Sequence, residues 1–406
     1  MTSSPPASSS VSPAPVPAST PASSGPGRRA RVAIIGTGGI ADIAHMPALR
    51  AQAHRVEIVA AVDTDPDRLK AFAARHSIPA ARATVEEMLE RDRPDLVHLC
   101  TPPSTHADHA VRCLEAGSWV WIEKPPARSL AEYDRIAAAE REGGPYASVV
   151  FQHRFGSAAL RLCALARADS LGRPLVAQCV TAWYRPHEYY DVPWRGRWRT
   201  EGGGPTMGHG IHQMDLMLAV LGDWAQVRAF AARLDRRVET EDVSAALVTF
   251  ASGAVATVLN SVLSPREESY LRFDFTDASV ELRHLYGYST ADWTLTPAPH
   301  LAGDPDRFAA WADSGADTPS SHSAQLPHLL DAWQRGTRPP LSGAEGRATL
   351  ELVTAIYRSA LTGETVRREQ LTADDPFYHH LHGGPDWDPA GGAAIPGPAL
   401  SLEAKR

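Results

Sequence analysis

The sequence predicts a doubly wound parallel α/β domain followed by an α+β domain with a large, mostly antiparallel sheet. Before residue 150, short apolar runs alternate with helical patterns, which implies right-handed crossovers between parallel strands. A glycine-rich turn, Gly36–Ala41, follows the first of these runs. After Val150, long strand-like runs follow one another with few helices between them, a pattern typical of antiparallel hairpins.

The expected elements of the first domain follow from apolar runs and helix start signals. Asp65 followed by Pro66 supplies an N-cap and a first-turn proline, while Thr84 and Ser129 each precede a glutamate by three residues, as in a capping box. The expected strands are Arg31–Gly36, Val56–Val62, Asp95–Thr101 and Trp119–Lys124, and the helices begin after Asp65, Thr84, Ser104 or Thr105, and Ser129.

In the second domain, Gly253 is a good hairpin turn between two strands. The expected strands are Leu175–Tyr184, Val227–Leu234, Val243–Phe250, Ala254–Val262 and Leu271–Phe275, with helices near 210–221, 323–335 and 343–361.

Composition divides the chain into four segments. Residues 1–30 are almost entirely Ser, Pro, Ala and Thr, which cannot bury enough apolar surface to offset the entropy of ordering, so we expect disorder. Residues 31–150 and 151–373 are the two domains, and 374–406, rich in Pro, Gly and His, is an irregular tail. Arg28-Arg29 resembles a twin-arginine export signal, but we expect the apolar residues that follow it to form the first strand of the sheet.

Several functional classes are disfavoured by the bulk properties. The net charge of −7 provides no basic surface for nucleic acid, and no apolar stretch is long enough to cross a membrane. The four cysteines (Cys100, Cys113, Cys163, Cys179) lack metal-ligand spacing and are expected to be reduced thiols of a cytoplasmic protein.

The turn after the first strand fits G-x-G-x-x-A. Gly36, Gly38 and Gly39 permit a tight turn and bring backbone N–H groups, together with Ile40, close to a pyrophosphate at a helix N-terminus. The alternative is a plain strand–helix turn. Asp63, at the end of the second strand, would bind the adenosine ribose and repel a 2′-phosphate, which favours NAD over NADP unless Arg68 swings in.

Two further segments lie at the carboxyl edge of the predicted sheet, where such sheets bind ligands. The first is Thr101-Pro102-Pro103, whose prolines stiffen a loop against the cofactor; His106 is either a cofactor contact or a polar first-turn residue. The second is Glu123-Lys124-Pro125.

Lys124 is the predicted acid–base residue. A poorly solvated lysine beside a nicotinamide cation has its ammonium form disfavoured, so it can exchange a proton with a substrate hydroxyl that loses hydride. Pro125 is a candidate for a cis bond that aims the side chain. The alternative is a surface lysine at a strand end.

A glycine-rich segment, Gly202–Asp215, leads into an apolar helix. His209 and His212, three residues apart at the helix start, can share one face. No third ligand is evident nearby, so no metal is predicted.

Together these motifs resemble the Gfo/Idh/MocA oxidoreductases, the glucose–fructose oxidoreductase and inositol dehydrogenase family. The resemblance runs from about residue 31 to about residue 365 and includes Gln152-His153-Arg154-Phe155 and Gly202-Gly203-Gly204 leading to Gly210-Ile211-His212. Trp194-Arg195-Gly196-Arg197-Trp198 is similar to members that act on nucleotide-linked or amino sugars.

The resemblance implies an α/β Rossmann domain, a doubly wound parallel sheet that binds the dinucleotide, and an α+β domain with an open-faced sheet that serves substrate binding and oligomerisation. The subunits would pair as a homodimer or homotetramer. Lys124 and His212 would handle the proton of a sugar or cyclitol hydroxyl, while Arg154, Trp194, Arg195 and His209 would line the substrate side.

One position departs from the family pattern. The usual motif is D-x-G-x-H, and the aspartate position is Gly208 here. That aspartate would orient the histidine, so its loss leaves open a second function, a dinucleotide-binding regulator without turnover. A separate third alternative is a glycosidase that uses NAD transiently.

Overall fold

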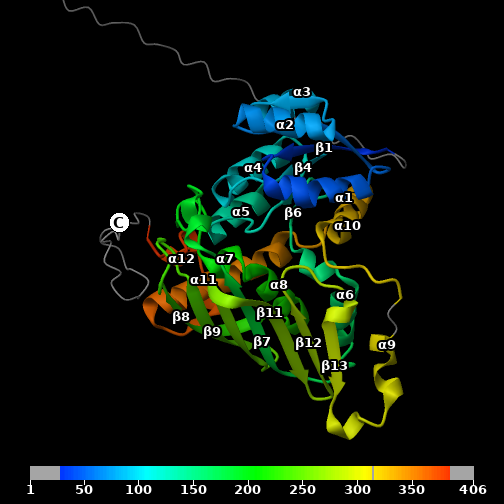
Figure 1. Ribbon diagram of the computed structural model, residues 1–406, viewed down its shortest axis with the longest axis vertical. Helices are drawn as coiled ribbons and strands as arrows, with labels where there is room; N and C mark the ends of the chain where they lie inside the picture. Colours follow the sequence, from blue (N-terminus) through cyan, green and yellow to red (C-terminus); the bar gives the residue numbers. More distant parts are fainter. Residues whose placement is uncertain (1–27, 313–314, 385–406) are drawn as a thin grey trace, which may run out of the picture.

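The computed structural model describes residues 28–312 and 315–384, arranged as two sheets with their helices (Figure 1). The predicted disordered extension lies almost wholly outside these residues, as does the end of the tail. Within the described part of the tail, Pro376–His379 forms one helical turn, α12.

The first sheet has six strands in the order β3-β2-β1-β4-β5-β6, and all its pairings are parallel. The predicted doubly wound sheet is thereby confirmed. Its strands are β1 (Ala30–Ile35), β2 (Val56–Val62), β3 (Ala80–Arg82), β4 (Leu96–Leu99), β5 (Trp119–Ile122) and β6 (Ala147–Val149), and its helices are α1 (Met46–Ala51), α2 (Pro66–His76), α3 (Val85–Asp92), α4 (His106–Glu115) and α5 (Leu130–Ala138).

Three of the start signals read from the sequence act as expected, whereas Thr105 at the start of α4 makes no side-chain cap hydrogen bond. Asp65 accepts hydrogen bonds from the backbone of Asp67 and Arg68 at the start of α2. Thr84 and Ser129 accept from the backbone of Glu87 and Glu132 in the same way.

The second sheet has eight strands in the order β13-β12-β11-β7-β10-β9-β8-β14. Most neighbours are antiparallel, as expected, but β10 pairs with β7 in parallel. The strands are β7 (Pro174–Tyr184), β8 (Trp224–Ala232), β9 (Val243–Phe250), β10 (Val255–Ser261), β11 (Leu263–Phe275), β12 (Ala278–His284), β13 (Trp293–Pro297) and β14 (Val366–Arg367). The sequence patterns missed β12, β13 and the two-residue β14.

Helices cover one face of this sheet and bring its residues to the first domain. The helices of this domain are α6 (Ser157–Arg167), α7 (Pro205–Gly208), α8 (Ile211–Leu221), α9 (Ala309–Ala312), α10 (His322–Arg335) and α11 (Gly343–Thr362), of which α7, α8 and α11 contact the sheet strands. α10 lies beside α1 of the first domain (Figure 1), where its Leu326 and Leu330 share a buried cluster with Trp121. The two domains therefore share core packing, which fixes the carboxyl edge of the first sheet against α7 and α8.

No helix among the described residues combines the length and apolar character needed to cross a membrane.

Candidate active site

The glycine turn approaches the neighbouring strand end very closely. Gly36 has a φ of +90°, and a Cβ there would lie 2.8 Å from the backbone carbonyl atoms of Cys100. At Gly38 and Gly39 a Cβ would meet no atom within 4 Å. Gly36 is thus required by the protein's own backbone, whereas the space above Gly38 and Gly39 is open to a bound group, which is what a pyrophosphate cradle requires.

Asp63 ties this turn to the end of β2. Its carboxylate accepts hydrogen bonds from Thr37 N at 2.8 Å and Thr37 Oγ1 at 2.7 Å. Arg68 donates to the same carboxylate, with Nη2 2.6 Å from Oδ1, so its guanidinium lies at this edge, paired with Asp63. Burial alone would raise the pKa of Asp63, but the hydrogen bonds from Arg68, Asp65 N and Thr37 outweigh it and hold the pKa well below its usual value.

His106 connects the two loops at the carboxyl edge. Its ring is fully buried, with Nδ1 2.8 Å from the Pro125 carbonyl oxygen and Nε2 2.8 Å from that of Thr101. Both ring nitrogens are occupied by backbone, which leaves neither for the direct cofactor contact that was one of the two expectations. His106 instead fixes the relative position of the Thr101–Pro103 and Glu123–Pro125 loops.

Lys124 follows β5 directly and reaches the second domain. The Lys124–Pro125 bond is cis, as the sequence suggested, and Nζ donates to the Gly208 carbonyl oxygen at 2.9 Å. Burial lowers the pKa of the Lys124 amine, partly opposed by the charge of Glu123. Lys124 is therefore the poorly solvated amine that the sequence indicated.

The Glu123 carboxylate lies in a buried histidine cluster that sequence reasoning missed. Its Oε1 is 2.9 Å from His45 Nε2 and 2.7 Å from His322 Nε2, and its Oε2 accepts a hydrogen bond from Lys124 N at 3.2 Å. His45 Nδ1 in turn lies 2.9 Å from His98 Nδ1. The expected cofactor contact of Glu123 therefore does not involve its carboxylate, which is used within the protein.

His45, Glu123 and His322 offer ligand atoms within 4.8 Å of one another, so they are also a geometrically possible metal group. The contacts of 2.7 and 2.9 Å, however, are ordinary hydrogen-bond distances, and two N–H donors satisfy the carboxylate without an ion. The arrangement is a buried, hydrogen-bonded carboxylate–histidine cluster next to Lys124.

His212, in the first turn of α8, is the second predicted proton carrier. It is 2% exposed, and neither ring nitrogen has a hydrogen-bond partner among the described residues. Its ring lies 4.9 Å from that of His153. Burial and the neighbouring Lys124 charge lower the pKa of His212 well below its usual value, so its ring is neutral at physiological pH.

Aromatic and cationic side chains gather around His209, one of the residues predicted to line the substrate side. Arg185 Nε donates to His209 Nε2 at 3.2 Å, and its guanidinium stacks 4.8 Å from the Trp183 ring. Arg195 lies 4.4 Å over the Trp194 ring and 4.0 Å over the ring of Tyr189. The predicted residues Trp194, Arg195 and His209 are thus brought into one region, to which Trp183, Arg185 and Tyr189 are added by the fold.

Arg154 is a different case from the other predicted substrate residues. Its Nε and Nη2 donate to the buried Asp215 carboxylate at 2.6 and 2.7 Å, and its Nη1 donates to Glu345 at 2.8 Å. Asp215 follows His212 by one helical turn, so the pair holds α8 in place. The prediction of Arg154 as a substrate ligand is corrected to a structural ion pair.

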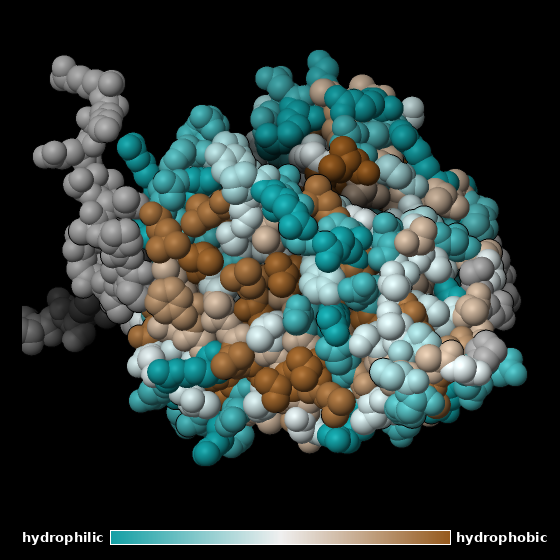
Figure 2. All heavy atoms as spheres, turned by 60° about the horizontal axis from the view of Figure 1, so that its bottom comes forward, coloured by the Kyte–Doolittle hydropathy of each residue, from teal (hydrophilic) through white to brown (hydrophobic). Residues whose placement is uncertain are grey.

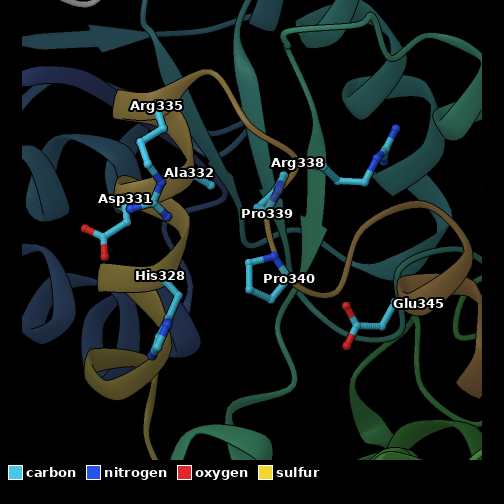
Figure 3. A pocket seen from close by; sticks show the side chains of 8 residues that line it. All are labelled: His328, Asp331, Ala332, Arg335, Arg338, Pro339, Pro340 and Glu345. Atoms are coloured by element: carbon cyan, nitrogen blue, oxygen red, sulfur yellow. The ribbon is translucent and has the colours of Figure 1, made fainter.

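A surface pocket lies between α10 and the start of α11 (Figure 3), where its Glu345 is the ion-pair partner of Arg154. Its lining is His328, Asp331, Ala332, Arg335, Arg338, Pro339, Pro340 and Glu345, none of which is a predicted site residue.

Two family models match the chain in succession. Residues 30–151 match an oxidoreductase family with an NAD-binding Rossmann fold, and residues 159–281 match the GFO/IDH/MocA C-terminal domain. The chain belongs to the Gfo/Idh/MocA oxidoreductase family. The resemblance stated from the motifs is therefore confirmed.

Named relatives cover either part or nearly all of the described chain. A 1-carboxy-3-chloro-3,4-dihydroxycyclohexa-1,5-diene dehydrogenase of Comamonas testosteroni is 31% identical, over 51% of this chain and 52% of its own length. The D-glucoside 3-dehydrogenase of Escherichia coli K12 is 26% identical over 83% of this chain and 97% of its own. Among solved structures, the WlbA dehydrogenase of Bordetella pertussis in complex with NADH and UDP-GlcNAcA matches with a TM-score of 0.74 and 26% identity, over 84% of this chain and 99% of that one.

Proposed function

We propose that this protein is an NAD(P)-dependent dehydrogenase or reductase that transfers hydride between a nicotinamide cofactor and a secondary hydroxyl or ketone of a sugar, cyclitol or sugar derivative. One observation carries the proposal. The half-buried Lys124 amine, whose pKa is lowered by burial, meets the second domain at Gly208, four residues before the neutral and unpartnered ring of His212. Relatives named as sugar dehydrogenases support the substrate class.

The residues present fit a nicotinamide dinucleotide. The open space above Gly38 and Gly39 would hold the pyrophosphate, Asp63 would take the adenosine ribose, and the Thr101–Pro103 loop would lie along the nicotinamide half. When bound, the oxidised nicotinamide supplies the hydride acceptor.

In the oxidation direction, the neutral Lys124 amine takes the proton of the substrate hydroxyl while the carbon that bears this hydroxyl gives up its hydride. The product is a ketone, and Lys124 becomes an ammonium ion. Because burial lowers the pKa of Lys124 below its usual value, the neutral form is more accessible than in a fully solvated lysine. His212, also neutral, would accept a hydrogen bond from the same or an adjacent hydroxyl through a free ring nitrogen.

NAD is favoured over NADP as the cofactor. Asp63 carries a firmly ionised carboxylate at the place where a 2′-phosphate would lie, and Asp65 adds a second negative charge. Arg68 is the competing influence, but its guanidinium is already paired with both carboxylates.

The open face of the second sheet supports pairing into a homodimer or homotetramer. Figure 2 shows apolar side chains gathered among polar ones on the lower part of the molecule. On the sheet strands, Phe230 is 56%, Leu247 55% and Val176 46% exposed. Exposed apolar groups that share a sheet face are typical of protein–protein contacts. The four cysteines are free and buried, which supports a reducing, cytoplasmic environment.

The decisive experiment compares Lys124→Met with Lys70→Met, a matched change at an exposed lysine of α2. Both variants are screened with NAD and NADP against sugars, cyclitols and nucleotide sugars. We expect Lys124→Met to bind NADH normally but to lose about 10²–10⁴-fold in kcat, while Lys70→Met keeps full turnover.

Three outcomes would contradict the proposal. Near-full turnover by Lys124→Met would remove the acid–base role. Tight NADH binding by the wild type with no reduction of NAD on any substrate would indicate a regulator, and cleavage of chromogenic glycosides without net redox change would indicate a glycosidase.

A further inference from the structure

A carboxylate lies beside Gly208 although the position itself carries no side chain. A Cβ at Gly208 would have one neighbouring atom within 4 Å, Oε1 of Glu201 at 3.6 Å. The backbone carbonyl oxygen of Gly208 accepts a hydrogen bond from Lys124 Nζ. Glu201 is 6% exposed, so its carboxylate is part of the interior of the site.

Glu201 is held by the loop that precedes the glycine run. Its Oε2 accepts a hydrogen bond from Gly196 N at 2.6 Å, and its backbone N–H donates to the Arg197 carbonyl oxygen at 2.9 Å. Its Oε1 lies 3.5 Å from Arg195 Nη1. One oxygen is therefore anchored by backbone, while the other faces the cationic side of the site.

The charged groups around Lys124 have opposing effects on its pKa, and Glu201 is one of the two carboxylates that raise it. Burial lowers the pKa of Lys124, Arg195 and Arg185 lower it further, and Glu123 and Glu201 raise it. The Glu123 charge is shared with two histidines, whereas Glu201 stands on the substrate side with Arg195. The groups that face Lys124 are Glu123, Arg185, Arg195, Glu201, His153, His209 and His212.

We propose that Glu201 is the positioning carboxylate of this site. Its carboxylate lies next to the space that a side chain at position 208 would occupy, and from there it stabilises the protonated form of Lys124 and holds Arg195 in place. The catalytic meaning of this proposal rests on the proposed function. The charge relation between Glu201 and Lys124 does not, and can be measured without a substrate.

The sequence offers a clean probe, because the only lysines are Lys70, Lys124 and Lys405. The full-length protein is treated with acetic anhydride over a range of pH, and the acetylation of each lysine is quantified by peptide mass spectrometry. Lys70 is the internal reference. Glu239→Gln is the matched control variant, because Glu239 accepts a backbone hydrogen bond from Trp198 in the same loop but is not among the groups that face Lys124.

We expect Glu201→Gln to move the Lys124 titration to lower pH, while Glu239→Gln and the Lys70 titration stay unchanged. The double variant Glu201→Gln/Gly208→Asp returns a carboxylate to the same volume and should move the Lys124 titration back. Gly208→Asp alone should move it to higher pH, which gives a second reading if Glu201→Gln folds poorly.

An unshifted Lys124 titration in Glu201→Gln would overturn the proposal, as would a shift that Gly208→Asp does not reverse. In enzyme with an identified substrate, the acidic limb of the kcat/KM profile for oxidation should move in the same directions, with a loss of about 10-fold in Glu201→Gln, less than the cost of losing an acid–base group outright. If no substrate is turned over, the proposed function fails while the lysine titration still decides the role of Glu201.

Discussion

Replacing Arg154 with methionine tests whether this residue holds α8 or binds substrate. The change removes the partner of Asp215, which is fully buried and would keep one neutral donor, Thr349 Oγ1 at 2.9 Å. Breaking a buried ion pair by removing one partner costs about 3–5 kcal/mol. The contact with Glu345, which is 51% exposed, adds little to this cost. We therefore expect the free energy of unfolding of Arg154→Met to fall by about 3–5 kcal/mol.

The assay is urea unfolding followed by tryptophan fluorescence, with the double variant Arg154→Met/Asp215→Leu as the control. The double variant should recover most of the loss, because no charge is left buried and unpaired. In the single variant the loss should shrink at acid pH, where the stranded carboxyl can take up a proton. A wild-type unfolding midpoint for Arg154→Met, together with a clearly raised KM, would refute the structural role and return Arg154 to the substrate side.

Three other predictions concern the glycine loop, cofactor choice and pH. Gly210→Ala should abolish or strongly destabilise folding, measured by thermal unfolding, because a Cβ there overlaps the Asn260 side chain. Gly208→Ala should unfold within about 1 kcal/mol of wild type, because a Cβ there makes only an ordinary contact with Glu201 Oε1 at 3.6 Å. Asp63→Ser should shift the NADP/NAD ratio of kcat/KM toward NADP by about 10-fold or more, because a negative charge that opposes the 2′-phosphate is removed; an unchanged ratio would contradict the role of Asp63. Burial raises the pKa of Glu241 from 4.5 to about 7, so the folded protein binds a proton that the unfolded chain releases between these values, and stability should fall with rising pH across that window by up to about 1.4 kcal/mol per pH unit. Glu241→Gln should flatten this slope in denaturant titrations, and an equal slope in both proteins would argue against the assignment.

Local patterns were sufficient for most of the fold. The glycine turn, the strand that ends at Asp63 and the apolar run before Lys124 each depend on neighbours within a few residues, so the four central strands of the parallel sheet follow from sequence alone. The short outer strands β3 and β6 were not predicted. The strands β12 and β13 were missed although both alternate apolar and polar residues, with Ala278, Val280 and Leu282 buried in β12 and Trp293 buried in β13. The parallel pairing of β7 with β10 was also missed, because strand order is set by packing over the whole sheet and not by any hairpin signal.

The candidate site divides in the same way. The sequence by itself determined that a lysine ends β5, that glycines leave room for a dinucleotide, and that His212 begins an apolar helix, because these are properties of short segments with a fixed period. Only the tertiary structure decided which charged side chains lie next to one another. It brought His322 to Glu123 across 199 residues, enclosed Arg154 with Asp215 across 61, and set the Glu201 carboxylate beside Gly208. Such contacts depend on how whole elements pack, and burial then fixes the charge state of each group, so no local pattern contains them.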